Sequence, residues 1–374
     1  MKLNFKRSDL LNSVNIALKA VSSRTTMPIL ECILIDASDR GVYLTANDME
    51  LGIETKVSNC VVEEGGRAAV DAKLFSDIIR KISQDDDSII SVTGNDSSLI
   101  TIVCENSTFR IQYKDPDQFP SLPDTDKENY ISLSQYTLKE VIRQTIFSIS
   151  PNDSNKMMTG ELFEVNEGML KVVSLDGHRI SIRNTELKED YGKMKVIIPG
   201  KTLNEISKII SGDNDKEVII YFSKNHVLFK FDDTLMVSRL IDGDYFKIDQ
   251  MLSSDYETKT VINKKEFLDC IERSTILVRE NDKKPLIINI GDSVMSLKLN
   301  SILGSMDDEI GVKKQGKDIM IGFNPRFLLD ALRVIDDEEI TLYMTNPKAP
   351  CFIKDEEGKY IYLILPVNFN PAVY

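Results

Sequence analysis

The sequence predicts an α+β protein built from three copies of one unit, each with two helices packed on antiparallel strands. Two observations lead to this prediction. A helical pattern of charges returns three times at nearly equal intervals, and strand-like runs with alternating apolar residues separate the helices. A chain of 374 residues is long enough for three domains of roughly 125 residues, each with its own core. We therefore expect domains at residues 1–126, 127–252 and 253–374.

The charge pattern consists of a base, an acid and a base at positions i, i+4 and i+7, which share one face of a helix. Its three copies are Lys73, Asp77 and Arg80; Lys201, Glu205 and Lys208; and Arg326, Asp330 and Arg333. The second copy follows the first by 128 residues, and the third follows the second by 125. The opposite face of each predicted helix is apolar, as expected for a helix packed on a sheet. One such row is explained by a solvated face steadied by ion pairs, but three rows in phase indicate a shared partner or surface.

A second predicted helix lies near the start of each unit. In the first unit its apolar face includes Leu10 and Val14, and Ser8 or Asp9 is expected to cap its amino-terminal end. The same apolar pair recurs as Leu138 and Ile142 and then as Phe267 and Ile271. Strand-like runs lie at residues 28–57, 88–113, 160–184, 217–240, 285–300 and 339–366. Each unit is therefore predicted to contain helix, strands, helix and strands, in that order.

The overall charge is unusual for a nucleic-acid-binding protein. The chain has 46 Lys and Arg residues against 59 Asp and Glu residues, which gives a net charge of −13. Nucleic-acid-binding domains are usually basic. If this chain meets DNA, its positive residues must be segregated on one surface, and binding should be weak and strongly salt-dependent.

The cysteines predict neither a disulfide framework nor a metal site. The five of them, Cys32, Cys60, Cys104, Cys270 and Cys351, are scattered, with no CxxC motif and no histidine at metal-ligand spacing. We interpret them as reduced core thiols and expect no cofactor. The amino-terminal stretch lacks the apolar run of a signal peptide, and no apolar run reaches the length of a membrane span. A soluble cytoplasmic protein is expected.

Six short segments, spread in order along the chain, carry a resemblance to a known family. They are RTTMPIL (residues 24–30), LTANDMEL (44–51), DQFPSLP (117–123), SLDGHRI (174–180), LIDGDY (240–245) and LILPV (363–367). With the threefold repeat, these segments resemble the bacterial DNA polymerase III beta subunit family, the sliding clamps. The resemblance implies the DNA-clamp fold: a head-to-tail homodimer closed into a ring around duplex DNA, acting without catalysis as a processivity factor.

The resemblance and the charged rows together suggest which residues approach phosphate. They are Arg24, Lys73, Arg80, Lys139, Arg143, Lys201, Lys208, Arg326 and Arg333. Contacts of this kind carry no sequence information, so they would hold a duplex without choosing a site. The acids within the rows would keep the potential shallow and permit sliding.

The resemblance also places the interface between protomers at the edges of the first and third domains. The matching positions are Phe109, Arg110, Ile111, Lys114, Ile276, Leu277, Asp307, Asp308 and Glu309. We expect an apolar centre surrounded by opposite charges. For each apolar residue in this set, an ordinary place in the core of its own chain is the alternative.

A groove between the second and third domains is implied for short peptides of partner proteins. The family's partners are the replicative DNA polymerase alpha subunit, the clamp loader, and repair and other proteins that carry a clamp-binding motif. The matching residues are Met158, Leu175, Gly177, His178, Arg179, Ile180, Phe246, Met251, Leu363, Leu365, Pro366 and Val367. Flexible apolar side chains suit varied peptides. This sequence departs from the family's pattern at Leu175, Phe246, Gln250 and Asn368, and its tail continues to Tyr374.

Two other classes of function must be weighed against this interpretation. An enzyme could use Asp176 and His178 as an acid–base pair, or the acidic runs at residues 85–87, 232–233 and 336–339 to hold Mg²⁺. Neither of the two histidines belongs to a HExxH or GxSxG motif, and without a P-loop any ATP chemistry would belong to a partner. A protein-binding scaffold that never encloses DNA is the second alternative, and the acidic charge favours it.

Overall fold

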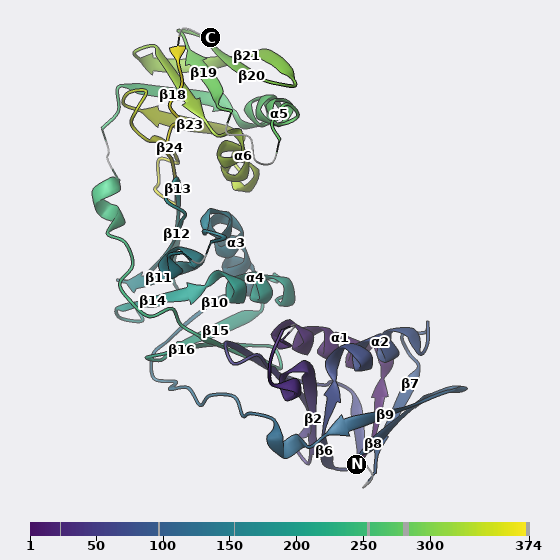
Figure 1. Cartoon of the computed structure of the whole chain (residues 1–374). Helices are drawn as coiled ribbons and strands as arrows, with labels where there is room; N and C mark the ends of the chain where they lie inside the picture. The colour runs from purple at the N-terminus through teal and green to yellow at the C-terminus, as the bar shows by residue number, and fades with distance from the viewer. Residues whose placement is uncertain (23, 96–97, 153, 253–254, 280–283, 372–374) are drawn as a thin grey trace. The chain divides into compact units, whose positions relative to one another are not determined.

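The computed structural model describes residues 1–22, 24–95, 98–152, 154–252, 255–279 and 284–371. Helices and antiparallel strands alternate along the chain (Figure 1), which confirms the predicted α+β class. No helix within these ranges is long and apolar enough to cross a membrane.

All the predicted helices are present in the predicted phase. The charged rows lie on α2 (Ala72–Lys81), α4 (Gly200–Ile209) and α6 (Pro325–Val334), and the other predicted helices are α1 (Arg7–Ala17), α3 (Gln135–Thr145) and α5 (Lys264–Thr275). Helices α2, α5 and α6 begin directly after a strand, at a polar side chain that accepts a hydrogen bond from a free amide. Asp71 accepts from the Leu74 amide at 2.8 Å, and Asn263 accepts from the Glu266 amide at 3.0 Å.

The predicted cap of α1 is wrong. The helix begins at Arg7, directly after Lys6, and no side chain caps it. Instead, the amides of Arg7 and Ser8 donate to the carbonyls of Ser88 and Asp86, at 2.9 and 3.1 Å. A turn distant in sequence thus satisfies the amides that a cap would otherwise serve, so Ser8 and Asp9 lie within the first turn of the helix.

Contacts divide the chain into two compact units, and unit 1 comprises Met1–Leu138 and Asn204–Leu240. Its strands are β1 (Lys2–Lys6), β2 (Cys32–Ser38), β3 (Gly41–Asn47), β4 (Leu51–Lys56), β5 (Cys60–Glu64), β6 (Gly66–Asp71), β7 (Ile89–Gly94), β8 (Leu99–Cys104), β9 (Ser107–Lys114), β10 (Tyr130–Ser134), β15 (Glu217–Phe222), β16 (His226–Phe231) and β17 (Thr234–Arg239). They form one sheet in the order β10-β15-β16-β17-β4-β3-β2-β6-β9-β8-β7-β1-β5. Helices α1 and α2 pack together, α1 against β3 and β4 and α2 against β2 and β6.

Unit 2 comprises Lys139–Leu203 and Ile241–Tyr374. Its strands are β11 (Gly160–Asn166), β12 (Met169–Leu175), β13 (Arg179–Glu186), β14 (Met194–Pro199), β18 (Thr258–Asn263), β19 (Leu286–Ile290), β20 (Val294–Ser301), β21 (Gly304–Gly316), β22 (Ile319–Phe323), β23 (Glu339–Met344), β24 (Cys351–Lys354) and β25 (Tyr360–Ile364). They form a second sheet in the order β14-β11-β12-β13-β25-β24-β23-β18-β21-β20-β19-β22. Helices α5 and α6 pack together on the third repeat (Figure 1).

The middle repeat contributes strands to both sheets. In unit 1, β17 pairs with β4 of the first repeat, and the hydroxyls of Thr55 and Thr234 meet across this joint at 2.8 Å. In unit 2, β13 pairs with β25 of the third repeat, with Ile180 opposite Leu363. Main-chain hydrogen bonds therefore join neighbouring repeats within each unit. The boundaries expected near residues 126 and 252 stay a prediction, because the compact units divide the middle repeat.

The thiols are free, and four of the five are buried. Cys60 differs from the expected core position, because it is half-buried on β5, at the end of the sheet. Burial raises the pKa of the Cys270 thiol to about 11 and that of Cys351 to about 12. Both thiols are therefore protonated at neutral pH and behave as small core residues.

Glu161 on β11 is an unusual core residue. Its side chain is fully buried, and neither of its carboxyl oxygens has a hydrogen-bond partner among the described residues. Burial raises the pKa of this carboxyl well above its usual value, and the nearby Thr145 hydroxyl, which donates to the Val141 carbonyl at 2.7 Å, offsets part of the rise. A neutral acid is the form that such an environment favours.

This environment predicts a specific pH dependence of stability. The unfolded carboxyl titrates near pH ~4.3, whereas the folded one titrates higher, so the native state retains a proton that the unfolded state loses. Stability should then fall as pH rises above ~4.3, by about 1.4 kcal/mol per pH unit, until the folded pKa is reached. The Glu161→Gln variant, which cannot ionise, should lack this component. Urea unfolding of both proteins at a series of pH values checks it, and parallel curves would contradict the assignment.

Candidate nucleic-acid and partner surfaces

Seven of the nine basic residues expected near phosphate are exposed. They are Arg24, Lys73, Arg80, Lys201, Lys208, Arg326 and Arg333. The rows hold ion pairs with neighbouring acids, with Lys208 2.8 Å from Glu205 and Arg80 3.8 Å from Asp77. The leading bases of the rows, Lys73, Lys201 and Arg326, are on the first turn of each helix.

Lys139 and Arg143 on α3 are half-buried. Arg143 is held within unit 2, because its Nη2 lies 2.5 Å from Glu140 and 2.8 Å from Asp336, and its Nη1 donates to the Val334 carbonyl at 3.2 Å. This guanidinium is therefore less free to reach a phosphate than the exposed bases of the rows.

The row on α6 differs from the other two in the use of its acid. Asp77 and Glu205 pair with the base of their own row, whereas Asp330 Oδ2 accepts a hydrogen bond from Arg179 Nη1 at 2.6 Å. Arg333 instead lies 2.9 Å from Glu272 on α5. The three rows thus have the same order of charges in the sequence but form two different sets of ion pairs in the structure.

Five of the residues predicted for the groove, Met158, Leu175, Ile180, Phe246 and Leu363, pack in one apolar cluster of unit 2. Strand register places Leu175, Ile180 and Leu363 opposite one another on three adjacent strands, and Phe352 and Tyr343 extend the same line. All five side chains on this line are buried in the cluster. Phe352 and Tyr343 were missed, although the alternation of apolar residues around each could have placed them on this face.

Other apolar side chains pack against this floor or lie on segments that contact it. Met158 on η5 (Lys156–Thr159) and Phe246 are partly buried and pack against the cluster. Met251 at the end of η6 (Ile248–Met251) is 50% exposed, and Leu365 is 37% exposed. Flexible apolar side chains are thus available for contact above a fixed floor.

The turn between β12 and β13 is built by Asp176. Its Oδ1 accepts from the amides of His178 and Arg179 at 2.9 and 3.1 Å, and its Oδ2 accepts from Arg179 Nε at 3.0 Å. Gly177 has φ of +88°, a conformation that side chains with a Cβ rarely adopt. The carboxylate that an acid–base mechanism would need is therefore occupied in holding the turn.

The exposed His178 connects this turn to the third repeat. Its ring stacks on Phe327 with centroids 6.0 Å apart, and its carbonyl accepts from the Leu365 amide at 2.8 Å. Beyond Leu365, the Val367 amide donates to the Gly322 carbonyl at 2.8 Å. Main-chain hydrogen bonds thus hold the carboxyl-terminal segment beside the Asp176 turn and β22.

Arg179 lies at the centre of this region. Its guanidinium contacts Asp176 and Asp330, donates from Nη2 to the Phe147 carbonyl at 2.5 Å, and lies over the rings of Phe147 and Phe327 at 5.4 and 4.6 Å. Phe147 belongs to η4 (Ile146–Ser148), which the sequence analysis did not connect with the groove.

The residues expected at a protomer interface lie on two strands with open stretches. In the described pairings of unit 1, residues 107–112 of β9 pair with β8 alone, and in unit 2 residues 304–311 of β21 pair with β20 alone. β9 presents Arg110 and Lys114, and β21 presents Asp307, Asp308 and Glu309. Asp308 is also paired within the chain, with Arg273 Nη2 at 2.5 Å.

The apolar residues of this set fall into two groups. Ile111 is buried in its own unit, and Leu277 packs against the core of the third repeat. Phe109 is 40% exposed and Ile276 is 76% exposed. Two more exposed apolar residues, Ile302 and Leu303, form the tip of the β20–β21 hairpin. They were not predicted, because the sequence carries no clear signal for β21.

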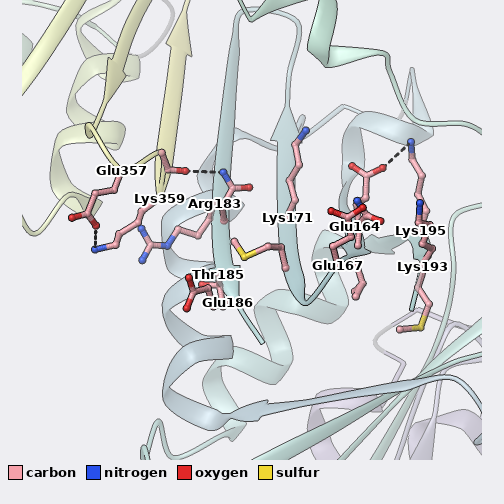
Figure 2. Close-up of a pocket in the computed structure, with 16 residues that line it drawn as sticks. Glu164, Glu167, Lys171, Arg183, Thr185, Glu186, Lys193, Lys195, Glu357 and Lys359 are labelled. Atoms are coloured by element: carbon pink, nitrogen blue, oxygen red, sulfur yellow. Dashed lines mark hydrogen bonds and ion pairs between the residues drawn. The ribbon is translucent and has the colours of Figure 1, made fainter. Parts of the chain in front are cut away.

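A concave surface of about 1170 Å³ lies in unit 2 at the ends of β11–β14. It is lined by five basic and four acidic residues, Lys171, Arg183, Lys193, Lys195, Lys359, Glu164, Glu167, Glu186 and Glu357. Figure 2 shows several of them already paired, with Glu164 3.6 Å from Lys195 and Glu357 2.5 Å from Lys359. Neither sign of charge dominates, so this surface has no clear preference for an anion or a cation.

The acidic runs do not assemble into a metal site in the part of the chain that the structure describes. In the first run, Asp86 pairs with Arg7 at 2.5 Å and Asp87 pairs with Lys6 at 2.6 Å. These carboxylates hold the turn that receives the amino-terminal end of α1.

Comparison with known proteins identifies the same family that the sequence motifs resemble. Family models of the N-terminal, central and C-terminal domains of the DNA polymerase III beta subunit match residues 1–123, 132–247 and 249–368. The beta sliding clamp of Staphylococcus aureus strain Mu50 is 33% identical over 378 residues, which cover 98% of this chain and 99% of that protein.

Solved structures agree with the sequence comparison. A DNA polymerase III beta subunit from Eubacterium rectale is 60% identical, with a TM-score of 0.95 over 99% of this chain and 100% of that one. The DNA polymerase sliding clamp of Bacillus subtilis is 32% identical, with a TM-score of 0.94 and the same coverage. The chain therefore belongs to the DNA polymerase III beta subunit family, the beta sliding clamps, and has their three-domain fold.

Proposed function

We propose that two copies of this chain close head to tail into a ring around duplex DNA and act there, without catalysis, as a DNA polymerase processivity factor. Three repeats per chain give six similar units in such a ring. The observation that carries this proposal is the exposed base at the first turn of α2, α4 and α6, at the same position in all three repeats. The same charged feature repeated at regular intervals suits the regular phosphate backbone of a duplex.

The open strand stretches support closure by two protomers. Pairing of β9 with β21 of a second copy would satisfy the free main-chain groups of both strands and join a basic strand to an acidic one. Because the two surfaces differ, the contact is heterologous, and such a contact makes a closed ring when its rotation closes after two copies. Phe109 and Ile276 provide exposed apolar area for the centre of this interface.

The groove in unit 2 is the proposed site for partner peptides. Its apolar floor suits the apolar side chains of a short segment, and its flexible rim suits several sequences. The proposed partners are the replicative polymerase alpha subunit, the clamp loader and other proteins with a clamp-binding motif. Bacterial replication takes place in the cytoplasm, so this function places the chain there, and we propose no membrane partner.

Retention on DNA separates a ring from a scaffold that never encloses DNA. After loading by the clamp loader, the protein should remain on nicked circular duplex and leave the same DNA once it is linearised, because encirclement is broken at a free end. Gel filtration of the complexes before and after restriction cleavage measures this. Equal retention on circular and linear DNA would refute encirclement.

The proposed interface predicts that one substitution converts the dimer into monomers. Ile276→Asp should yield folded monomers, because a charge at a desolvated interface is unfavourable while the exposed position leaves the core intact. Ile89→Asp, at a residue 58% exposed on β7, is the matched control and should stay dimeric. Analytical ultracentrifugation should give one chain mass for the first variant and two for the control, and a dimeric Ile276→Asp protein would defeat the interface.

The charged rows predict a change in the salt dependence of DNA binding. Replacement of Lys73, Lys201 and Arg326 by Ala should lower the slope of log K against log salt by about one for each base that contacts phosphate. A control with Lys224, Lys230 and Lys247 replaced by Ala loses the same charge from exposed positions outside the helices. Titration of a labelled duplex at several salt concentrations measures both, and equal slopes for the two triple variants would reject the assignment.

A further inference from the structure

The Arg179 side chain is built into the protein and is not available to a partner peptide. Its side chain is 11% exposed, its Nε, Nη1 and Nη2 each donate to an oxygen of this chain, and the rings of Phe147 and Phe327 lie close to the guanidinium. A ligand would have to displace these contacts to reach it. Its role therefore depends on the segments of this chain that it connects.

Three segments distant in sequence meet at this guanidinium. One is the Asp176 turn, which presents His178; the second is η4, through the carbonyl of Phe147; the third is α6, through Asp330 and Phe327. The chain then continues from η4 to η5, which carries Met158 at the rim of the proposed groove. Two parts of the groove are thus fixed to α6 through one side chain.

Asp330 is the more exposed of the two carboxylates that pair with Arg179. Its side chain is 34% exposed on the charged face of α6, between Arg326 and Arg333, and it is absent from the groove residues. The corresponding acids of α2 and α4 pair with other bases, Asp77 with Arg80, and Glu205 with Lys208 and Lys19. Both acids lie in unit 1, which contains none of the predicted groove residues.

We propose that Asp330 is a positioning residue for the partner groove, acting through Arg179 from the charged face of α6. With Asp330 removed, Arg179 keeps one carboxylate, Asp176, and a partly buried cation with a single counter-charge is poorly stabilised. The guanidinium then shifts toward Asp176 or toward solvent. Either movement loosens its bonds to the Phe147 carbonyl and the stack that supports His178. This inference deepens the proposed function and rests on it.

The test compares Asp330→Asn with Asp77→Asn and Glu205→Gln, which remove the same charge from the equivalent helices. The probe is the purified replicative polymerase alpha subunit of the host, with binding followed by biolayer interferometry. Asp330→Asn should bind about tenfold more weakly, mainly through faster dissociation, whereas both controls should match the wild type within twofold. If Asp330→Asn does not fold by circular dichroism, Asp330→Glu takes its place and should show a smaller loss in the same direction.

A double-mutant cycle distinguishes positioning through Arg179 from a general loss of stability. In an Arg179→Lys background, which loses the planar fork of donors, Asp330→Asn should have almost no further effect on affinity. The NMR signal of the His178 ring should also move in Asp330→Asn, whereas that of His226, the other histidine, should not. A purely structural role would lower the melting temperature and leave affinity and the His178 signal unchanged.

The outcomes separate this inference from the function on which it rests. If the wild-type chain does not bind the alpha subunit, the proposed function fails. If the wild type binds and folded Asp330→Asn binds equally well, the function stands and the positioning role of Asp330 is overturned. Additive losses in the cycle would also overturn it, because they would show that Asp330 acts independently of Arg179.

Discussion

The architecture depends on the pairing of strands between neighbouring repeats. A pleated strand has one set of main-chain groups on each edge, and an unpaired edge is a site of adventitious association. β17 and β4 satisfy each other in unit 1, as β13 and β25 do in unit 2. The apolar floor of the proposed groove is a direct consequence of the second joint, because Ile180 of the middle repeat and Leu363 of the third become neighbours on one face. The open stretches of β9 and β21 are two places, in the part of the chain that the structure describes, where one strand edge has no partner strand.

The sequence predicted most of this fold because its signals are local. Apolar periodicity placed six helices and most strands, and the threefold spacing supplied the repeat. Prediction from the sequence failed in two kinds of place. At the start of α1, the backbone carbonyls of Asp86 and Ser88, which are distant in sequence, accept the hydrogen bonds that a capping side chain would accept. The long strand β21 has few buried side chains, so its sequence shows little alternation.

The candidate sites were predictable to a smaller extent. The motif around residues 174–180 identified Leu175 and Ile180 of the apolar cluster, but the line of side chains continues through Phe352 and Tyr343 only because of strand register. Likewise, the common pattern of the three charged rows suggested that each acid pairs with a base of its own row. Asp330 instead pairs with Arg179, which comes from a different repeat. No spacing within one helix contains that information.

Charge and topology explain how an acidic protein can be associated with DNA. A surface that grips a duplex by adhesion needs a strong positive field, and it then resists movement along the backbone. The rows on α2 and α4 instead contain bases partly compensated by acids on the same face. On α6 Asp330 pairs with Arg179, and Arg333 pairs with Glu272 of α5, so the bases of this row are not compensated by the acid of their own row. Attraction is thus modest and uneven around the repeats, so in the proposed function retention must come from encirclement, and the exposed bases need only centre the duplex while it moves.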